Sequence, residues 1–198
     1  MWSNPGPLPD RGRPLPRETW DRQYREGTWE NLGSIDQLAH YMVIVGYVHH
    51  LFESPKILDV GCGPGRLAEL LAPSSFKSYL GIDFSAEAIR QARLRAENHM
   101  RFRVADLNEW NPTGRVSVII FCESLNYAIH PVSTLLRYAR ALEKTGAVIV
   151  SLYRHRNHGR IWKNAERYFQ IAASTAIINH KGETWDVRVL RHPPPRAG

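Results

Sequence analysis

Three carboxylates stand at the ends of three apolar runs, and their spacing is typical of a nucleoside-binding site. Asp59 lies in "ILDVGCGPGR", Asp83 in "GIDFS" and Asp106 in "VADL". Asp83 follows Gly65 by 18 residues, close to the spacing expected for a carboxylate that binds ribose hydroxyls. If the three runs are parallel strands, their acids share the carboxyl edge of one sheet, where open α/β folds bind ligands.

The glycine-rich turn after the first run limits which nucleotide fits. Glycines there permit positive φ angles and let a ligand approach the backbone, and the helix that follows has unpaired N-terminal amides. A dinucleotide fingerprint needs Gly-x-Gly-x-x-Gly, but Arg66 occupies the place of its third glycine, which disfavours a nicotinamide-dependent oxidoreductase. Asp59, just before the glycines, suits a cationic amino group better than a pyrophosphate. S-adenosylmethionine, a nucleoside with an amino-acid group and no phosphates, fits this pattern.

The elements that must position these residues alternate between strand and helix, which predicts parallel βαβ units. A helix over Gly159–Ala173 and two antiparallel strands, Thr175–His180 and Thr184–Arg191, follow them. The expected fold class is α/β, a Rossmann-like, doubly wound, mainly parallel seven-stranded sheet with an antiparallel last strand. The other expected strands are Lys56–Gly61, Tyr79–Asp83, Arg101–Asp106, Val116–Glu123 and Ala147–Tyr153, and the helices between them are Arg66–Leu71, Ala86–Asn98 and Val132–Glu143.

The 198 residues are enough for one domain with a full core. Residues 1–18 are rich in proline and glycine and are expected to be a flexible tail, as are residues 193–198, so the domain spans 19–192. No apolar run is long enough for a membrane span and no signal pattern is present. With only Cys62 and Cys122, reduced thiols and a cytoplasmic location are expected.

The net charge of +7 raises the question of an anionic partner. The positive charge is concentrated before residue 26 and in the stretch 154–167, where a solvated basic face is the simplest interpretation. No nucleic-acid recognition motif is present, so a nucleic-acid partner is not favoured. The sequence does not specify an oligomeric state.

From about residue 20 to 192 the chain resembles the class I S-adenosylmethionine-dependent methyltransferases. "ILDVGCGPGR" is similar to that family's first motif, and "GIDFS", "VADL" and "VIIFCESLNY" resemble its next motifs in the same order. "EKTGAVIVSLYR" resembles the fifth-strand segment, with Lys144-Thr145-Gly146 where the family usually has Pro-Gly-Gly. The resemblance also implies that the last strand inserts between the fifth and sixth.

The resemblance implies roles for the residues around the first two acids. Asp83 would bind the ribose hydroxyls and Phe84 would lie against the adenine. The methionine part of the cofactor would be held by Asp59 and by the backbone of the turn at Gly61, Cys62, Gly63 and Gly65.

Further roles follow from the later motifs and from the segment before the first one. Asp106 would accept a hydrogen bond from the adenine amino group, the Leu107 amide would face a ring nitrogen, and Cys122 and Glu123 would line the floor near the sulfonium. Residues 19–54 would form an N-terminal cap over the site. Tyr24, Trp29 and Tyr41 are its candidate cofactor contacts, with core packing as the alternative.

Methyl transfer from a sulfonium needs a general base only where the acceptor must lose a proton. The candidates in "CESLNYAIHP" are Glu123, Tyr127 and His130, although His130 has the alternative of beginning a helix. Relatives that methylate oxygen often carry an acid–histidine pair where this chain has Asn126-Tyr127, so the base remains open. No metal is expected.

The predicted function is S-adenosylmethionine-dependent methylation of a small organic acceptor, at oxygen and by in-line displacement. Strand four does not end in the Asn/Asp-Pro-Pro-Tyr signature of enzymes that methylate amino groups of nucleic-acid bases. An RNA methyltransferase, favoured by the net charge, and a non-catalytic S-adenosylmethionine-binding protein remain as alternatives. The basic stretch 154–167 is a further candidate for attracting an acidic substrate.

Overall fold

The computed structural model describes residues 15–72, 76–97, 99–155 and 158–192. Most of the two expected tails, residues 1–14 and 193–198, lies outside these ranges. The end of the first tail was predicted wrongly, because residues 17 and 18 belong to a helix, α1 (Arg17–Arg25). Pro16 directly precedes it with a φ of −56°, a conformation that suits the start of a helix.

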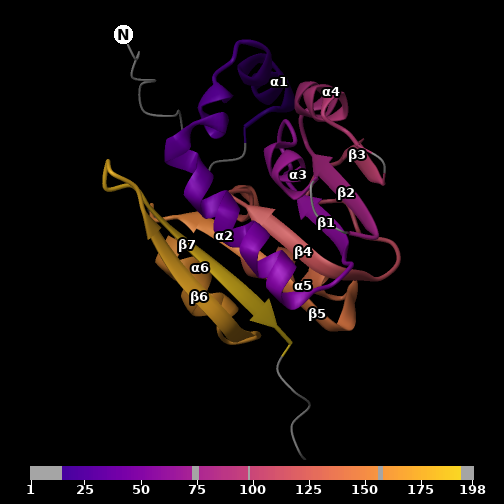
Figure 1. Cartoon of the computed structure of the whole chain (residues 1–198), viewed down its shortest axis with the longest axis vertical. Helices are drawn as coiled ribbons and strands as arrows, with labels where there is room; N and C mark the ends of the chain where they lie inside the picture. Colours follow the sequence, from indigo (N-terminus) through magenta and orange to yellow (C-terminus); the bar gives the residue numbers. More distant parts are fainter. Residues whose placement is uncertain (1–14, 73–75, 98, 156–157, 193–198) are drawn as a thin grey trace, which may run out of the picture.

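A single seven-stranded sheet runs through the molecule in the order β3-β2-β1-β4-β5-β7-β6 (Figure 1). All neighbouring strands are parallel except β7, which is antiparallel to β5 and to β6. The expected fold class and the insertion of the last strand are therefore confirmed. The strands are β1 (Lys56–Val60), β2 (Ser78–Asp83), β3 (Met100–Val104), β4 (Val116–Cys122), β5 (Leu142–Tyr153), β6 (Gln170–Ile178) and β7 (Thr184–Arg191).

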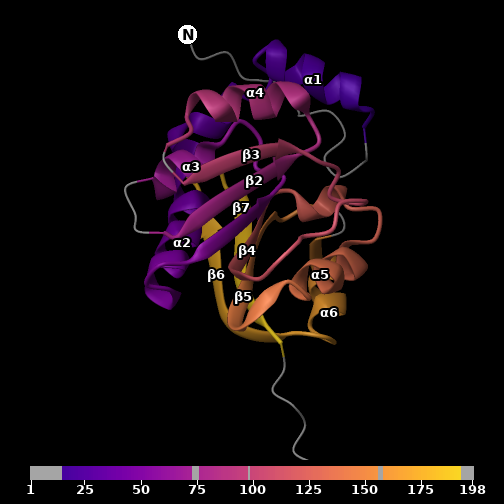
Figure 2. The same cartoon turned by 90° about the vertical axis from the view of Figure 1, so that its right-hand side faces the viewer.

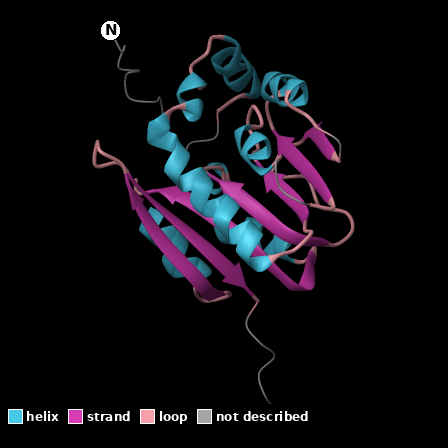
Figure 3. Cartoon of the chain, in the orientation of Figure 1, coloured by secondary structure: helices cyan, strands magenta, loops and turns pink. Residues whose placement is uncertain are grey.

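Helices cover both faces of this sheet (Figures 2 and 3). One core lies between the sheet and α2, α3 and α4, and the other between the sheet and α5 and α6. Central strands such as β4 are buried on both faces, which explains their nearly continuous apolar sequences. The helices are α2 (Ile35–Leu51), α3 (Arg66–Leu71), α4 (Ala86–Leu94), α5 (Pro131–Ala139) and α6 (His158–Ala165), with short 3-10 turns η1 (Glu30–Gly33) and η2 (Leu125–Tyr127).

The main error of the sequence prediction concerns the helix expected over Gly159–Ala173. It ends at Ala165, and β6 begins at Gln170, which pairs with Arg191 of β7. Backbone pairing with a distant strand overrides local helix propensity here. The helices expected to end at Asn98 and Glu143 also stop early, at Leu94 and Ala139.

The order of the strands places a crevice where ligands bind in such folds. From β1 the chain winds outward to β2 and β3 on one side, and β4 and β5 follow on the other side. This reversal opens a crevice at the carboxyl ends of β1 and β4. Over the ranges given above, no helix has the length and apolar character needed to cross a membrane.

Candidate active site

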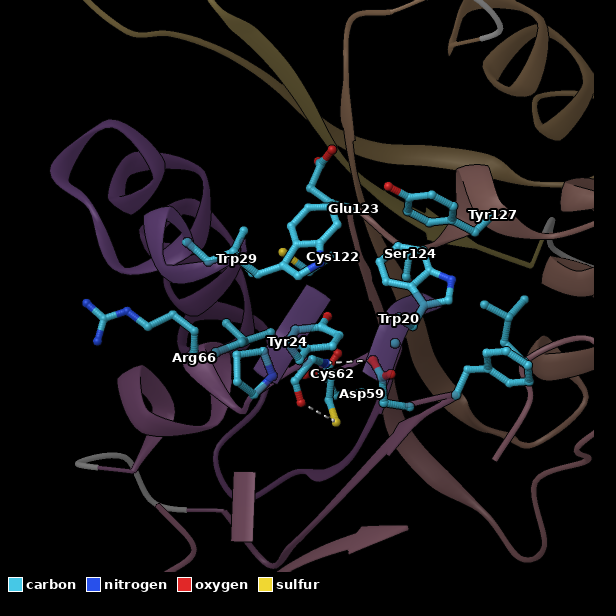
Figure 4. A pocket seen from close by; sticks show the side chains of 18 of the residues that line it. Trp20, Tyr24, Trp29, Asp59, Cys62, Arg66, Cys122, Glu123, Ser124 and Tyr127 are labelled. Atoms are coloured by element: carbon cyan, nitrogen blue, oxygen red, sulfur yellow. Dashed lines mark hydrogen bonds between the residues drawn. The ribbon is translucent and has the colours of Figure 1, made fainter. Parts of the chain in front are cut away.

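A cavity of roughly 200 Å³ lies at the carboxyl edge of the sheet, over the ends of β1 to β4. Residues of α1, η1 and α2 also line it, and Trp20, Tyr24 and Trp29 are seen there beside the residues of the strand ends (Figure 4). The residues that line it are Leu15, Trp20, Tyr24, Trp29, Leu32, Tyr41, Asp59, Gly61, Cys62, Gly63, Pro64, Arg66, Leu67, Asp83, Phe84, Asp106, Leu107, Asn108, Cys122, Glu123, Ser124 and Tyr127.

Asp59 is a buried carboxylate with unused hydrogen-bonding capacity. Its side chain is 1% exposed, and the hydroxyl of Tyr79 donates to Oδ2 at 2.5 Å. Oδ1 has no partner among the described residues, and burial raises the pKa of the carboxyl group from 3.8 to about 7. A cationic group bound beside Oδ1 would supply the missing partner and favour the ionised carboxylate.

The glycine turn has packing reasons for its composition as well as a functional one. Gly61, Gly63 and Gly65 all have positive φ angles, from 54° to 85°. A Cβ on Gly61 would collide with the side chain of Ser124, and one on Gly65 would lie 3.2 Å from Ala92 of α4. Gly65 does not line the cavity. Its close approach to Ala92 explains why glycine is needed at this position, and its role in cofactor binding stays a prediction.

Asp83 joins the glycine turn to the next strand–helix connection. Its Oδ2 accepts a hydrogen bond from the amide of Gly63 at 2.8 Å, and its Oδ1 accepts one from the amide of Ser85 at 2.9 Å. Burial raises the pKa of Asp83 to about 6. Each carboxylate oxygen keeps a further lone pair, so the side chain can still accept hydrogen bonds from a ligand in the cavity.

The loop after β3 is held by side chains from elsewhere in the chain. Asp106 Oδ1 accepts hydrogen bonds from the backbone and side-chain nitrogens of Asn108, at 2.7 Å and 3.0 Å. The guanidinium of Arg137, on α5, donates to the carbonyls of Leu107 and Asn108. Asn108 in turn accepts from the amide of Ile129 at 2.9 Å. The predicted adenine contacts, Asp106 and Leu107, are thus presented by a braced loop.

Four aromatic side chains form one wall of the cavity (Figure 4). Trp20 stacks on Trp29 with ring centroids 5.4 Å apart and meets Tyr127 edge-on at 5.1 Å. Tyr24 lies next to both indoles, and burial together with the Asp83 carboxylate raises the pKa of its phenol. Tyr41 of α2 lines the cavity and also belongs to the core, so its core packing is observed and its contact with the cofactor stays a prediction.

α1 is fastened to the first turn of α4. Asp21 Oδ1 accepts a hydrogen bond from the Ser85 hydroxyl at 2.5 Å and another from the Glu87 amide at 3.1 Å. Gln91 donates to the Tyr24 carbonyl at 3.1 Å. Asp21 therefore satisfies an unpaired amide at the N-terminus of α4, in the position where a negative charge is favoured.

Glu123 is a cavity residue with an unusual backbone conformation. Its φ is +56°, in the left-handed region that a non-glycine residue rarely adopts. The Ser151 hydroxyl donates to Oε1 at 2.7 Å and the Tyr153 amide donates to Oε2 at 2.8 Å, so β5 fixes the carboxylate. Such strain persists only where the surroundings enforce it, and it is commonly found at functional sites. Cys122, just before it, has its thiol pKa raised by burial.

The predicted site residues do not all come together. His130 is exposed at the start of α5 and does not line the cavity, which matches its alternative role of beginning a helix. In the basic stretch, Arg154 is bound to the buried Asp186, at 2.8 Å from Oδ1, so its charge is largely balanced. Arg156 of that stretch lies outside the described residues. The described part of the chain contains no cluster of metal-binding side chains.

Several cavity residues were missed from the sequence. Trp20 lies one helical turn before Tyr24, so the shared helix face was a usable signal. Ser124 and Asn108 act through contacts with distant segments, Val60 and Ile129, which no local pattern reveals. Arg66 was considered only because it replaces the third glycine of a dinucleotide fingerprint. In the structure it lines the cavity, and its guanidinium donates a hydrogen bond to Glu69.

Comparison with known sequences identifies one matching family. A family profile described as "Methyltransferase domain" matches residues 51–188. The trans-aconitate 2-methyltransferase of Rhodopseudomonas palustris is 32% identical over 100 residues, covering 49% of this chain and 38% of that protein. The mitochondrial ubiquinone biosynthesis O-methyltransferase of Candida albicans is 30% identical over 105 residues, covering 50% of this chain and 32% of that protein. The chain thus spans less than half the length of these curated relatives.

Solved structures share the fold over nearly the whole chain. The N-methyltransferase NodS of Bradyrhizobium japonicum, in complex with S-adenosylhomocysteine, matches with a TM-score of 0.78 and 15% identity over 93% of this chain and 100% of that one. Magnesium protoporphyrin IX methyltransferase of Synechocystis, with bound S-adenosylmethionine, matches with a TM-score of 0.68 and 18% identity over 88% and 94% of the two chains.

Proposed function

Because the chain belongs to the methyltransferase-domain family and has the class I fold that uses S-adenosylmethionine, we propose that it methylates a small organic acceptor in the cavity described above. The observation that carries the proposal is the convergence of Asp59, Asp83 and Asp106, from three different strand ends, on one cavity. With both cysteines as free thiols, a cytoplasmic location belongs to the same proposal.

The residues present fit this cofactor. Asp59, with its unpartnered oxygen, would hold the amino group, and Asp83 would hold the ribose hydroxyls. Asp106 and Leu107 would contact the adenine from the loop braced by Arg137. When bound, S-adenosylmethionine supplies an electrophilic methyl group whose in-line displacement from sulfur leaves a neutral thioether.

The acceptor side of the cavity is the part lined by Trp20, Trp29, Tyr127 and Glu123. The aromatic wall would exclude water and orient the acceptor, since alignment is the main task in a displacement of this kind. One curated relative is named for trans-aconitate and the other for the biosynthesis of ubiquinone, and both names support a small organic acceptor here. Both matches cover about half of this chain.

Oxygen is the proposed acceptor atom, with Glu123 as the group that takes the hydroxyl proton. Glu123 lines the cavity, and β5 holds its carboxylate in place through Ser151 and Tyr153. A carboxylate oxygen has two lone pairs, so accepting one hydrogen bond does not prevent it from taking the acceptor proton. His130, outside the cavity, is assigned no step.

Calorimetric titration with S-adenosylhomocysteine tests the cofactor part of the proposal. Wild type should bind, and Asp83→Ala should bind about tenfold more weakly or worse, because charge-assisted hydrogen bonds are lost. Binding of NADH in place of S-adenosylhomocysteine would refute the proposal.

Turnover assays over a panel of hydroxylated and aminated small molecules test the acceptor part. Methylation of a hydroxyl is the expected result, whereas methylation confined to amines would refute oxygen as the acceptor atom. Methylation of RNA, accompanied by steeply salt-dependent binding, would favour the RNA alternative. Cofactor binding without any turnover would favour a non-catalytic role.

A further inference from the structure

The two edges of the sheet differ in how they are protected (Figures 1 and 2). β3, at one edge, has five residues and exposes Arg101 and Arg103. Charged side chains and short length are devices by which natural proteins prevent pairing between sheet edges. β6, at the opposite edge, has nine residues, QIAASTAII, and contains neither a charge nor a proline. The β3 edge thus has features that disfavour pairing with another strand, and the β6 edge lacks them.

Within the described residues, the outer side of β6 carries unused backbone donors and acceptors. Its inner side pairs with β7 from Gln170, opposite Arg191, to Ile178, opposite Thr184. No strand of the described ranges pairs with its outer side. The register shift between Ile171 and Ala173 leaves the six residues from Ala173 to Ile178 as a regular strand. That segment is long enough for a further strand to pair with it.

The side chains of β6 are also incompletely covered on both faces. Ala173 and Ile177 pack against the α2 core but stay partly exposed, and the Thr175 hydroxyl lies 2.6 Å from that of Tyr47 on α2. On the opposite face Ile178 is 68% exposed. A neighbouring strand would continue both layers and complete the burial of these side chains.

We infer that the outer edge of β6 is the interface for a second copy of this chain, through antiparallel β6–β6 pairing about a two-fold axis. In such an isologous interface each strand meets its own sequence, so a charge close to the two-fold axis would lie near the same charge of the other copy. β6 is uncharged over its whole length and therefore meets this requirement. The two sheets would join into one continuous sheet, with the partly exposed Ala173 and Ile177 of both copies beside the axis.

The oligomeric state of the full chain in solution tests this inference. Sedimentation equilibrium from micromolar to millimolar concentration should show a reversible dimer. Ser174→Glu should raise the dimer dissociation constant by about tenfold or more, because it places two glutamates near the axis. Within one copy the new carboxylate lies across from Arg188 of β7, so the fold should be kept. Ser174→Gln is the matched uncharged control and should dimerise like wild type.

A mixing experiment makes the test specific to this edge. Ser174→Glu and Ser174→Lys should each dimerise poorly alone and should associate when mixed, because opposite charges then face each other. Dimerisation should also slow hydrogen exchange of the β6 amides. A wild-type chain that stays monomeric overturns the inference, as does a Ser174→Glu variant that dimerises as tightly as Ser174→Gln. Pairing of this edge with another protein while the chain itself stays monomeric would also overturn it.

Discussion

Replacing Asp59 by asparagine should stabilise the ligand-free protein while it weakens cofactor binding. The wild-type carboxyl group is 1% exposed, and burial raises its pKa from 3.8 to about 7. Below the lower value both the folded and the unfolded chain carry the proton. As the pH rises toward the upper value, the unfolded chain releases its proton first, so the free energy of unfolding falls.

The pKa values set the size of this effect. A shift of about three units corresponds to an upper limit of about 4 kcal/mol at pH 7 and above. The asparagine of the variant would have no such dependence, and its amide oxygen would still accept the hydrogen bond of Tyr79. The variant should therefore gain free energy of unfolding relative to wild type as the pH rises from about 4 to about 7, with little gain at the acid end.

Urea unfolding of both proteins at several pH values measures this difference, and calorimetry with S-adenosylhomocysteine should show affinity reduced by about tenfold or more. Asp36→Asn is a control of opposite sign, because the Lys181 hydrogen bond lowers the pKa of Asp36. Relative to wild type, that control should lose free energy of unfolding as the pH rises through the acid range, because only wild type gains the stabilisation from the ionised Asp36. A difference between Asp59→Asn and wild type that does not change with pH would refute the electrostatic argument. Unchanged cofactor affinity would refute the role of Asp59 in binding.

Three further predictions concern the cavity and its surroundings. Trp20→Ala removes three ring contacts, each worth about 0.5–1.5 kcal/mol. In steady-state assays kcat/KM for the acceptor should therefore fall roughly tenfold or more while S-adenosylhomocysteine affinity changes little. An equal loss of cofactor affinity would argue against an acceptor wall. Glu123→Gln should lower kcat by about 10²-fold or more in the same assays, and an unchanged kcat would exclude Glu123 as the base. His40 is buried with both ring nitrogens unpartnered among the described residues, and burial lowers its pKa from 6.5 to about 4. Because the unfolded chain binds this proton more tightly, wild type should lose up to about 3 kcal/mol of unfolding free energy as the pH falls from about 6.5 to about 4. His40→Phe should not show this loss. Urea unfolding in which the two proteins have the same pH dependence would contradict the prediction.

The parts of the fold that follow local rules could be predicted from the sequence. The buried strands, the glycine turn and the acids at the ends of β1 and β2 are each specified by a few neighbouring residues. The early end of α6 could not be predicted, because Gln170 is drawn into β6 by its pairing with Arg191 of β7. Long-range pairing of this kind overrides local propensity.

The candidate site shows the same division. That Asp59, Asp83 and Asp106 share one cavity could be predicted, because each lies at or just after the end of a parallel strand. The left-handed backbone of Glu123 was not readable, because it depends on Ser151 and Tyr153, roughly thirty residues away on β5. The attachment of α1 through Asp21 was missed for a similar reason, since its partner Ser85 lies on a distant connection.

The two halves of the cavity come from different stretches of the chain. The strand ends that would hold the cofactor lie within residues 51–188, the region shared with the family, whereas Trp20, Tyr24, Trp29 and Tyr41 precede it. Substitutions in the earlier segment would therefore change the aromatic wall of the cavity without altering the strand ends themselves. Grafting this segment between relatives would test whether acceptor specificity can be changed while the strand ends stay the same.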